Sequence, residues 1–197
     1  MEVKLVTREL SLETWPDFER LFEKPGEWGG CWCMYYQRPH SLKSWADKMG
    51  LTREERIAKN REDKLELVKE RCSHGILVYA KGEPVGWCQY GPKEELPRVD
   101  AGRKYKKLAL GDDSKKLWRI TCFVVDRKFR RKGVATAGLK AALRSMEKKG
   151  GGLVEGYPAV RSGALAVWFG TVSMFEREGF KKVAPFGRSN VLMRRSI

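Results

Sequence analysis

The sequence has no long apolar run and nothing that would mark it for export. A membrane-spanning helix needs about 20 consecutive apolar residues, and no run in this chain approaches that length. The start, MEVKLVTREL, has no charged head followed by an apolar stretch, so we expect no signal peptide. These absences argue against a membrane protein and predict a cytoplasmic one.

The chain also lacks the marks of a disulfide framework, of repeats and of linkers. Its five cysteines are odd in number, and an odd count without an export signal favours free thiols. We find no internal repeat, low-complexity segment or dividing linker, so we expect one domain over residues 1–197.

Positive charge, by contrast, is abundant. The chain has 40 lysines and arginines against 25 aspartates and glutamates, a formal net charge of +15. Such an excess raises the local concentration of anions without specifying which anion. Nucleic acid, acidic protein, a membrane surface and a phosphorylated cofactor all fit, and so does a well-solvated Lys-rich surface.

The order of predicted elements indicates an α/β layout on a mixed sheet. Apolar periodicity and capping residues predict helices within 11–24, from Thr52 to about residue 71, over 133–149 and over 171–179. Apolar or alternating runs predict strands at 3–7, 117–126, 153–158, 180–186 and 190–195, and a hairpin at 75–91.

The segment FVVDRKFRRKGVAT, residues 123–136, has the pattern of an anion cradle. An apolar strand leads into a basic turn, then into Gly133 and a helix start. Glycine allows a tight turn and a close ligand approach, and the free N–H groups of a first helical turn attract anions. A pyrophosphate would fit, although the bare pattern also describes a tight turn beside solvated basic residues.

Two motifs resemble those of the GNAT superfamily of acyl-CoA-dependent N-acyltransferases. Arg130 to Ala135 fits the family's pyrophosphate motif, Arg/Gln-x-x-Gly-x-Gly/Ala, and MFEREGF at 174–180 is similar to its closing helix and turn. The element order is similar from Val3 to Arg195. Two motifs in the right order are far more specific than either alone.

The resemblance implies a GNAT-like α/β fold. Its sheet would be mixed, mostly antiparallel and of six to seven strands, with helices on both faces and a cleft where the fourth and fifth strands splay apart. Residues 1–197 would form one acyltransferase-like domain, with an elaborated acceptor-side segment at 25–72 and a long connection between the third and fourth strands at 92–116.

The implied activity is N-acetyl transfer from acetyl-CoA, the co-substrate, to an amine that attacks directly. A backbone N–H at residues 123–125 would polarise the thioester carbonyl. The residues implied in cofactor binding are Phe123, Val124, Val125, Arg130, Arg131, Lys132, Gly133, Val134, Ala135, Thr136 and Ser173.

The family's usual acid and base are missing. Thr121 and Phe175 occupy the positions where many relatives carry a glutamate and a tyrosine. Glu155 and Tyr157 are the predicted catalytic substitutes, because they are two positions apart on the fifth strand and face the same way. The alternative is that Glu155 is the structural partner of an arginine and Tyr157 is core.

Cysteine chemistry is a weaker hypothesis. Alternation would place Cys122 on the strand face opposite Thr121 and Phe123, buried and inert. A zinc site from Cys31, Cys33, Cys72 and His74 has poor ligand spacing, so we predict no metal.

The stretch WGGCWCMYYQRPH, residues 28–40, falls where the family builds its acceptor pocket. A helical turn here would put Trp32 and Tyr36 on one face, with Gln37 as a polar handle, and part of the stretch would be core. The predicted acceptor-binding residues are Trp28, Trp32, Met34, Tyr35 and Tyr36, together with Tyr90.

Two other functions stay open. A non-catalytic acyl-CoA sensor of the same fold would explain the missing acid and base. A nucleic-acid-binding module would explain basic runs such as 103–107, although no recognised nucleic-acid motif is present. The expected partner is a small-molecule or peptide amine, without membrane contact, and a homodimer is left open.

Overall fold

The computed structural model describes residues 4–24, 30–40, 42–108, 110, 116–161 and 164–197. Seven strands form one sheet in the order β1-β2-β3-β4-β5-β7-β6. The strands are β1 (Leu5–Glu9), β2 (His74–Ala80), β3 (Glu83–Pro92), β4 (Leu117–Val125), β5 (Leu153–Gly156), β6 (Lys181–Phe186) and β7 (Asn190–Ser196). β4 and β5 run parallel, and the other neighbouring pairs are antiparallel. The predicted mixed, mostly antiparallel sheet is confirmed.

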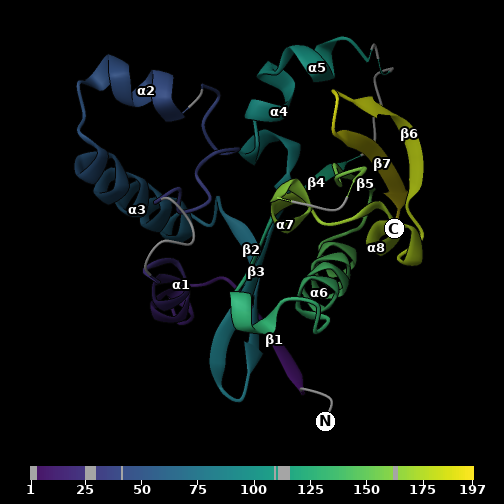
Figure 1. The fold of residues 1–197 in the computed structure, drawn as a ribbon, viewed down its shortest axis with the longest axis horizontal. Coiled ribbons are helices and arrows are strands. Elements are labelled where there is room, and N and C mark those ends of the chain that lie inside the picture. Colours follow the sequence, from purple (N-terminus) through teal and green to yellow (C-terminus); the bar gives the residue numbers. More distant parts are fainter. Residues whose placement is uncertain (1–3, 25–29, 41, 109, 111–115, 162–163) are drawn as a thin grey trace.

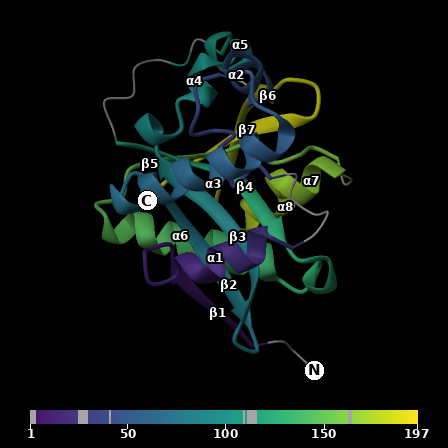
Figure 2. The same cartoon turned by 90° about the vertical axis from the view of Figure 1, so that its left-hand side faces the viewer.

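Helices cover both faces of the sheet (Figures 1 and 2). One face carries α1 (Trp15–Phe22) and α3 (Arg53–Lys69), with α2 (Leu42–Met49) beyond them, and the other carries α6 (Val134–Lys148) and α8 (Val172–Arg177). The remaining short helices are η1 (Lys93–Glu95), α4 (Arg98–Ala101), α5 (Arg103–Lys106), η2 (Arg127–Phe129) and α7 (Ala164–Phe169). In the part of the chain that the structure describes, no helix is long and apolar enough to cross a membrane.

Strand alternation divides the core between the two faces. In β2, Ile76 and Val78 belong to the cluster under α6, whereas Leu77 and Tyr79 belong to the cluster under α1. Successive strand side chains point to opposite faces, so one buried strand serves both clusters. The predicted capping box at Thr52 is present and begins α3.

The sheet splits between β4 and β5. The two strands pair from Leu117 with Leu153 to Ile120 with Gly156, where β5 ends. β4 continues to Val125 and pairs there with β3. The far half of β4 therefore presents an edge to the interior, at the cleft that the sequence predicted.

A β-bulge in β4 corrects one expectation. Gln89 is opposite Cys122 and Tyr90 is opposite Ile120, which leaves Thr121 as the extra residue. Ile120 and Phe123 both lie in the α6-side core, although they are three apart. Thr121 and Cys122 therefore face the α1 side together, and the prediction that they lie on opposite faces was wrong.

Candidate active site

A left-handed glycine begins α6. Gly133 has a φ of 79° and is the N-cap of the helix. A Cβ at this position would meet no atom within 4 Å, so the space in front of the backbone is open. The first N–H groups of α6 have no intrahelical acceptors and, with the helix dipole, favour an anion.

Polar contacts hold the turn between β4 and α6. The Asp126 carboxylate accepts the Lys128 N–H at 3.0 Å and pairs with Lys24 at 2.5 Å. Burial alone would raise the pKa of Asp126, but the contacts with Lys24 and Lys128 outweigh it and lower that pKa. Arg130 Nε donates to the Val125 carbonyl at 3.2 Å, so the basic turn is fastened to the end of the strand.

A cavity of about 490 Å³, the cradle cavity, lies in front of this turn. Basic, small and apolar residues line it: Val125, Phe129, Arg130, Arg131, Gly133, Val134, Ala135, Thr136, Val167, Gly170, Thr171, Met174 and Arg177. Seven of these are residues that the sequence predicted for cofactor binding. The α7 contribution was missed because nothing in the sequence indicated α7 or its position. The helix of Thr171, Met174 and Arg177 was predicted, but Ser173 was the residue expected from it.

Four predicted cofactor residues lie elsewhere. Phe123 is core and packs edge-on against Phe175, with ring centroids 6.2 Å apart. Val124 faces the opposite side of β4. Lys132 is exposed beside Phe129, and Ser173 is exposed with its Oγ 3.2 Å from Thr171 Oγ1. Thr171 takes the place in the lining that was expected for Ser173.

A second cavity of about 360 Å³, the thiol cavity, lies on the other side of β4. Its lining is mainly apolar and thiol-bearing: Phe22, Cys31, Cys33, Tyr35, Tyr36, Gln89, Cys122, Val124, Trp168 and Phe169. Val124 and Trp168 line the thiol cavity, whereas their neighbours in sequence, Val125 and Val167, line the cradle cavity. The two cavities therefore flank the end of β4 and α7.

The aromatic stretch is divided between core and cavity. Tyr35 and Tyr36 line the thiol cavity. Trp32 and Met34 are buried, and the Trp32 ring stacks 5.9 Å from Phe22. The expected helical turn does not form, because Trp32 and Cys33 adopt left-handed φ values of 48° and 51°.

The structure supports an acceptor role for neither of the remaining predicted residues, Trp28 and Tyr90. Trp28 lies outside the described residues. Tyr90 is buried on the α6 side, where its hydroxyl is 2.6 Å from Ser145 Oγ, so the structure does not bring it to either cavity. Gln89, its neighbour, lines the thiol cavity instead, donates to the Cys33 carbonyl at 2.8 Å and accepts from Thr121 at 3.1 Å.

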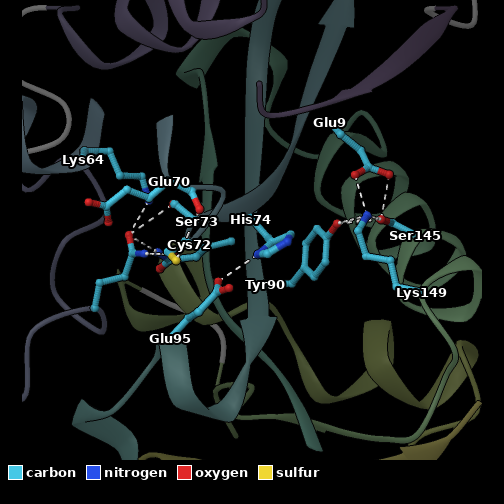
Figure 3. A network of polar contacts seen from close by, with 12 residues as sticks. Glu9, Lys64, Glu70, Cys72, Ser73, His74, Tyr90, Glu95, Ser145 and Lys149 are labelled. Atoms are coloured by element: carbon cyan, nitrogen blue, oxygen red, sulfur yellow. Dashed lines mark hydrogen bonds and ion pairs between the residues drawn. The ribbon is translucent and has the colours of Figure 1, made fainter. Parts of the chain in front are cut away.

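The Gln37 side chain makes structural hydrogen bonds and does not line the thiol cavity. Its side-chain oxygen accepts from Lys64 Nζ at 2.6 Å and Ser73 Oγ at 3.3 Å, and its amide donates to the Cys72 carbonyl. Figure 3 shows a polar network in three groups: Lys64 and Ser73 belong to the first, His74 and Glu95 form the second, and Tyr90 belongs to the third with Ser145 and Lys149. These contacts hold the aromatic stretch against α3 and β2.

The same network extends to the other face of the sheet. His74 Nδ1 is 2.8 Å from Glu95, and Lys149 Nζ is 2.7 Å from Glu9 and 2.6 Å from Ser145 (Figure 3). Burial alone would raise the pKa of Glu9, but Lys149 and Ser145 lower it. Every one of these groups has a local partner, so the network stabilises the fold rather than presenting reactive groups.

Cys33 and Lys64 are buried, and each has a pKa below its ordinary value. Cys33 Sγ accepts the Trp87 indole N–H at 3.2 Å. Burial alone would raise the pKa of the Cys33 thiol, but hydrogen bonding from Cys122, the Lys64 charge and the Trp87 N–H together lower it. Burial lowers the pKa of Lys64 to about 8 against the opposing effect of the thiols. Cys31 differs, since burial raises the pKa of its thiol to about 12.

Glu155 is enclosed by donors. It is fully buried and accepts from Tyr157 at 2.6 Å, Tyr105 at 2.9 Å and Arg194 at 2.8 Å, with Arg119 Nε at 3.4 Å. Burial and the Glu155 charge raise the pKa of Tyr157 well above its ordinary value. Neither Glu155 nor Tyr157 lines the cradle cavity or the thiol cavity. These contacts favour the structural alternative that the sequence left open.

The zinc hypothesis has no support in the described residues, which contain no group of three or more His, Cys, Asp or Glu side chains placed to hold a metal ion. Cys72 is exposed, and its Sγ donates to the Glu70 carbonyl at 3.5 Å. All five cysteines are free thiols.

Comparison with known proteins agrees with this geometry. Residues 15–160 match the acetyltransferase (GNAT) family. The fold is similar to that of PaiA N-acetyltransferase from Thermoplasma acidophilum, solved in complex with coenzyme A, at 15% identity and a TM-score of 0.53 over 98% of this chain and 99% of that chain. No curated protein gives a significant match.

Two further structures have the same fold. Ribosomal-protein-S5-alanine acetyltransferase from Vibrio fischeri is 11% identical, with a TM-score of 0.55 over 100% of this chain and 95% of that chain. Ard1 from Thermoplasma volcanium is 16% identical, with a TM-score of 0.52 over 99% of each chain. At such low identities these similarities show the fold alone.

Proposed function

Since this chain belongs to the GNAT family of acetyltransferases, which use acetyl-CoA, we propose that it transfers an acetyl group from acetyl-CoA to a primary amine. The observation that supports this most is the pair of cavities on either side of the end of β4. A donor in the cradle cavity and an acceptor in the thiol cavity would meet where β4 and β5 have separated.

The cradle cavity fits coenzyme A. Arg130 and Arg131 supply positive charge, and the open backbone at Gly133 leaves room for a pyrophosphate. Val125, Val167 and Met174 give the same cavity an apolar wall that suits the pantetheine arm. When bound, acetyl-CoA would supply an acetyl thioester.

The protein's own groups would position and deprotonate the acceptor. A backbone N–H on the free edge of β4 can donate to a carbonyl oxygen. No carboxylate belongs to the described lining of the thiol cavity, and Cys33 is the titratable group of that lining with a lowered pKa. We therefore assign proton acceptance to Cys33, in preference to Glu155, whose oxygens are already occupied by donors.

Thermal shift and turnover test the proposal together. Acetyl-CoA should raise the melting temperature, and an amine panel should release free CoA. Gly133→Glu should abolish the shift, because it adds bulk and negative charge to the cradle. Gly82→Glu is the matched control, since Gly82 has a φ of +82° and equally open space but lies in the β2–β3 turn.

The outcomes separate the candidate functions. A shift that survives in Gly133→Glu would refute the cofactor assignment. A shift without CoA release from any amine would instead favour the sensor, which the occupied Glu155 and the buried Phe175 keep in consideration.

A further inference from the structure

A third hollow adjoins the thiol cavity. It has a volume of about 760 Å³ and shares Tyr35 and Tyr36 with that cavity. Its other walls come from α4, α5, the end of the aromatic stretch at Pro39 and His40, and Phe186 of β6, and they include Arg98, Arg103 and Lys104. We call it the basic hollow. The Arg98 N–H donates to the Tyr36 carbonyl at 3.3 Å, so its two walls are joined.

The charge of the basic hollow is uncompensated. Among the described residues, no Asp or Glu side chain lines it and no ion pair engages Arg98, Arg103 or Lys104. The nearest acidic residue in sequence, Asp100, is bound by Arg119 through contacts of 2.6 and 2.8 Å. Three cations therefore lie in a hollow that shares Tyr35 and Tyr36 with the thiol cavity, without a carboxylate from the described residues.

Arg98 is held in position. Its guanidinium carbon lies 4.1 Å from the centroid of the Tyr35 ring, and its Nη2 donates to the Tyr35 hydroxyl at 3.3 Å. Stacking on an aromatic ring orients an arginine and leaves other N–H groups available for an oxyanion. Tyr35 itself lines both spaces, so this cation is fixed at their junction.

We propose that the basic hollow binds a carboxylate or phosphate group of the acceptor, so that the substrate is a primary amine carrying an anionic group. An amine reaches the protein mainly as an ammonium ion, which three nearby cations repel. A second, anionic group reverses that repulsion and positions the amine toward the thiol cavity. Polyamines and lysine-rich peptides are correspondingly poor acceptors. This inference rests on the proposed function.

The test uses matched amines that differ in charge. Acetyl transfer is measured to the peptide amides Ala-Asp-Asp, Ala-Asn-Asn and Ala-Lys-Lys, and to phosphoethanolamine against ethanolamine. We expect kcat/KM to be at least tenfold higher for the anionic member of each set. The peptide set tests recognition of a carboxylate, and the ethanolamine set tests recognition of a phosphate.

A charge-reversal variant locates the effect. Arg103→Glu with Lys104→Glu should reverse the acceptor order while leaving the acetyl-CoA thermal shift unchanged. Lys106→Glu with Lys107→Glu is the control, because both lysines are exposed, follow Arg103 and Lys104 after one residue, Tyr105, and do not line the hollow. An unchanged order in the first variant, or an equal change in the control, overturns the inference.

Direct binding separates this inference from the proposed function. The same three peptides, fluorescently labelled at the C-terminus, are titrated with protein in the presence of CoA. If no amine is acetylated but the acidic peptide binds best and loses affinity in the Arg103/Lys104 variant, the proposed function fails and the anion site holds. If the acidic peptide binds no better than the neutral one, the anion site is refuted whatever the turnover.

Discussion

Cys33 is the side chain on which the proposed chemistry depends most. It lines the thiol cavity, accepts the Trp87 N–H and has left-handed backbone geometry with a φ of 51°. Non-glycine residues in this region cost on the order of 1–3 kcal/mol and gather at functional sites. The sequence presented Cys33 only as a weak zinc ligand, because its partners Trp87 and Lys64 are far away along the chain.

Cys33→Ser should lower kcat about a hundredfold, because a serine hydroxyl does not ionise near neutral pH. The acid limb of the pH profile of kcat should disappear, and the acetyl-CoA thermal shift should stay. Cys31→Ser is the matched control, since the pKa of that thiol is raised to about 12 and it stays protonated. Wild-type turnover and an unchanged pH profile in Cys33→Ser would exclude this thiol as the proton acceptor.

Lys64 leads to a prediction about stability. Its pKa in the folded protein is about 8, below the ordinary value of 10.5, so between these values the unfolded chain holds a proton that the folded protein has lost. The Lys64 contribution to the free energy of unfolding should therefore rise with pH across this window, by at most roughly 1.4 kcal/mol per pH unit.

The measurement is urea unfolding of the Cys33→Ser protein with and without Lys64→Met at pH 7, 8, 9 and 10. The difference in unfolding free energy, protein with Lys64 minus protein with Lys64→Met, should increase by about 2 kcal/mol between pH 8 and pH 10, because the slope is below its maximum near both pKa values. Both proteins carry Cys33→Ser, because the Lys64 charge acts on the pKa of that thiol, and the difference then cancels titrations that the two proteins share. A difference that stays constant with pH would contradict a depressed pKa at Lys64.

At the scale of secondary-structure elements, features that depend on adjacent residues could be predicted, and features that depend on distant residues could not. The capping box of α3, the hairpin of β2 and β3 and the turn at Gly133 each depend on a few adjacent residues, and each is present. The β4 bulge at Thr121 depends on pairing with β3, which is distant in sequence. Alternation therefore gave the wrong face for Thr121.

The candidate site likewise has parts that could be predicted from adjacent residues and parts that could not. The basic turn could be predicted because its chemistry is contiguous over 130–136. The roles of Trp32 and Tyr36 could not, since two left-handed residues send one ring into the core and the other into a cavity. Likewise α7, which lies between the cradle and thiol cavities, has its position set by contacts with β4 rather than by its own sequence.

At the scale of the whole molecule, the net charge of +15 has two separable effects. It produces a long-range field that attracts any anion, and salt screens this field over a Debye length of about 8 Å at physiological ionic strength. It also provides local cations, such as those of the basic hollow, which contact a bound anion directly. Only the local effect depends on which lysines and arginines are present.

Salt dependence distinguishes these effects. Raising NaCl from 50 to 500 mM at saturating acetyl-CoA should raise KM for Ala-Asp-Asp amide by about tenfold and KM for Ala-Asn-Asn amide by less than twofold, because only the acidic peptide is attracted. The Lys106/Lys107 double variant, which loses as much charge as the Arg103/Lys104 variant, should keep most of this slope. The Arg103/Lys104 variant should lose it or reverse its sign. Equal slopes in the two variants would mean that the overall field, and not the basic hollow, selects the acceptor.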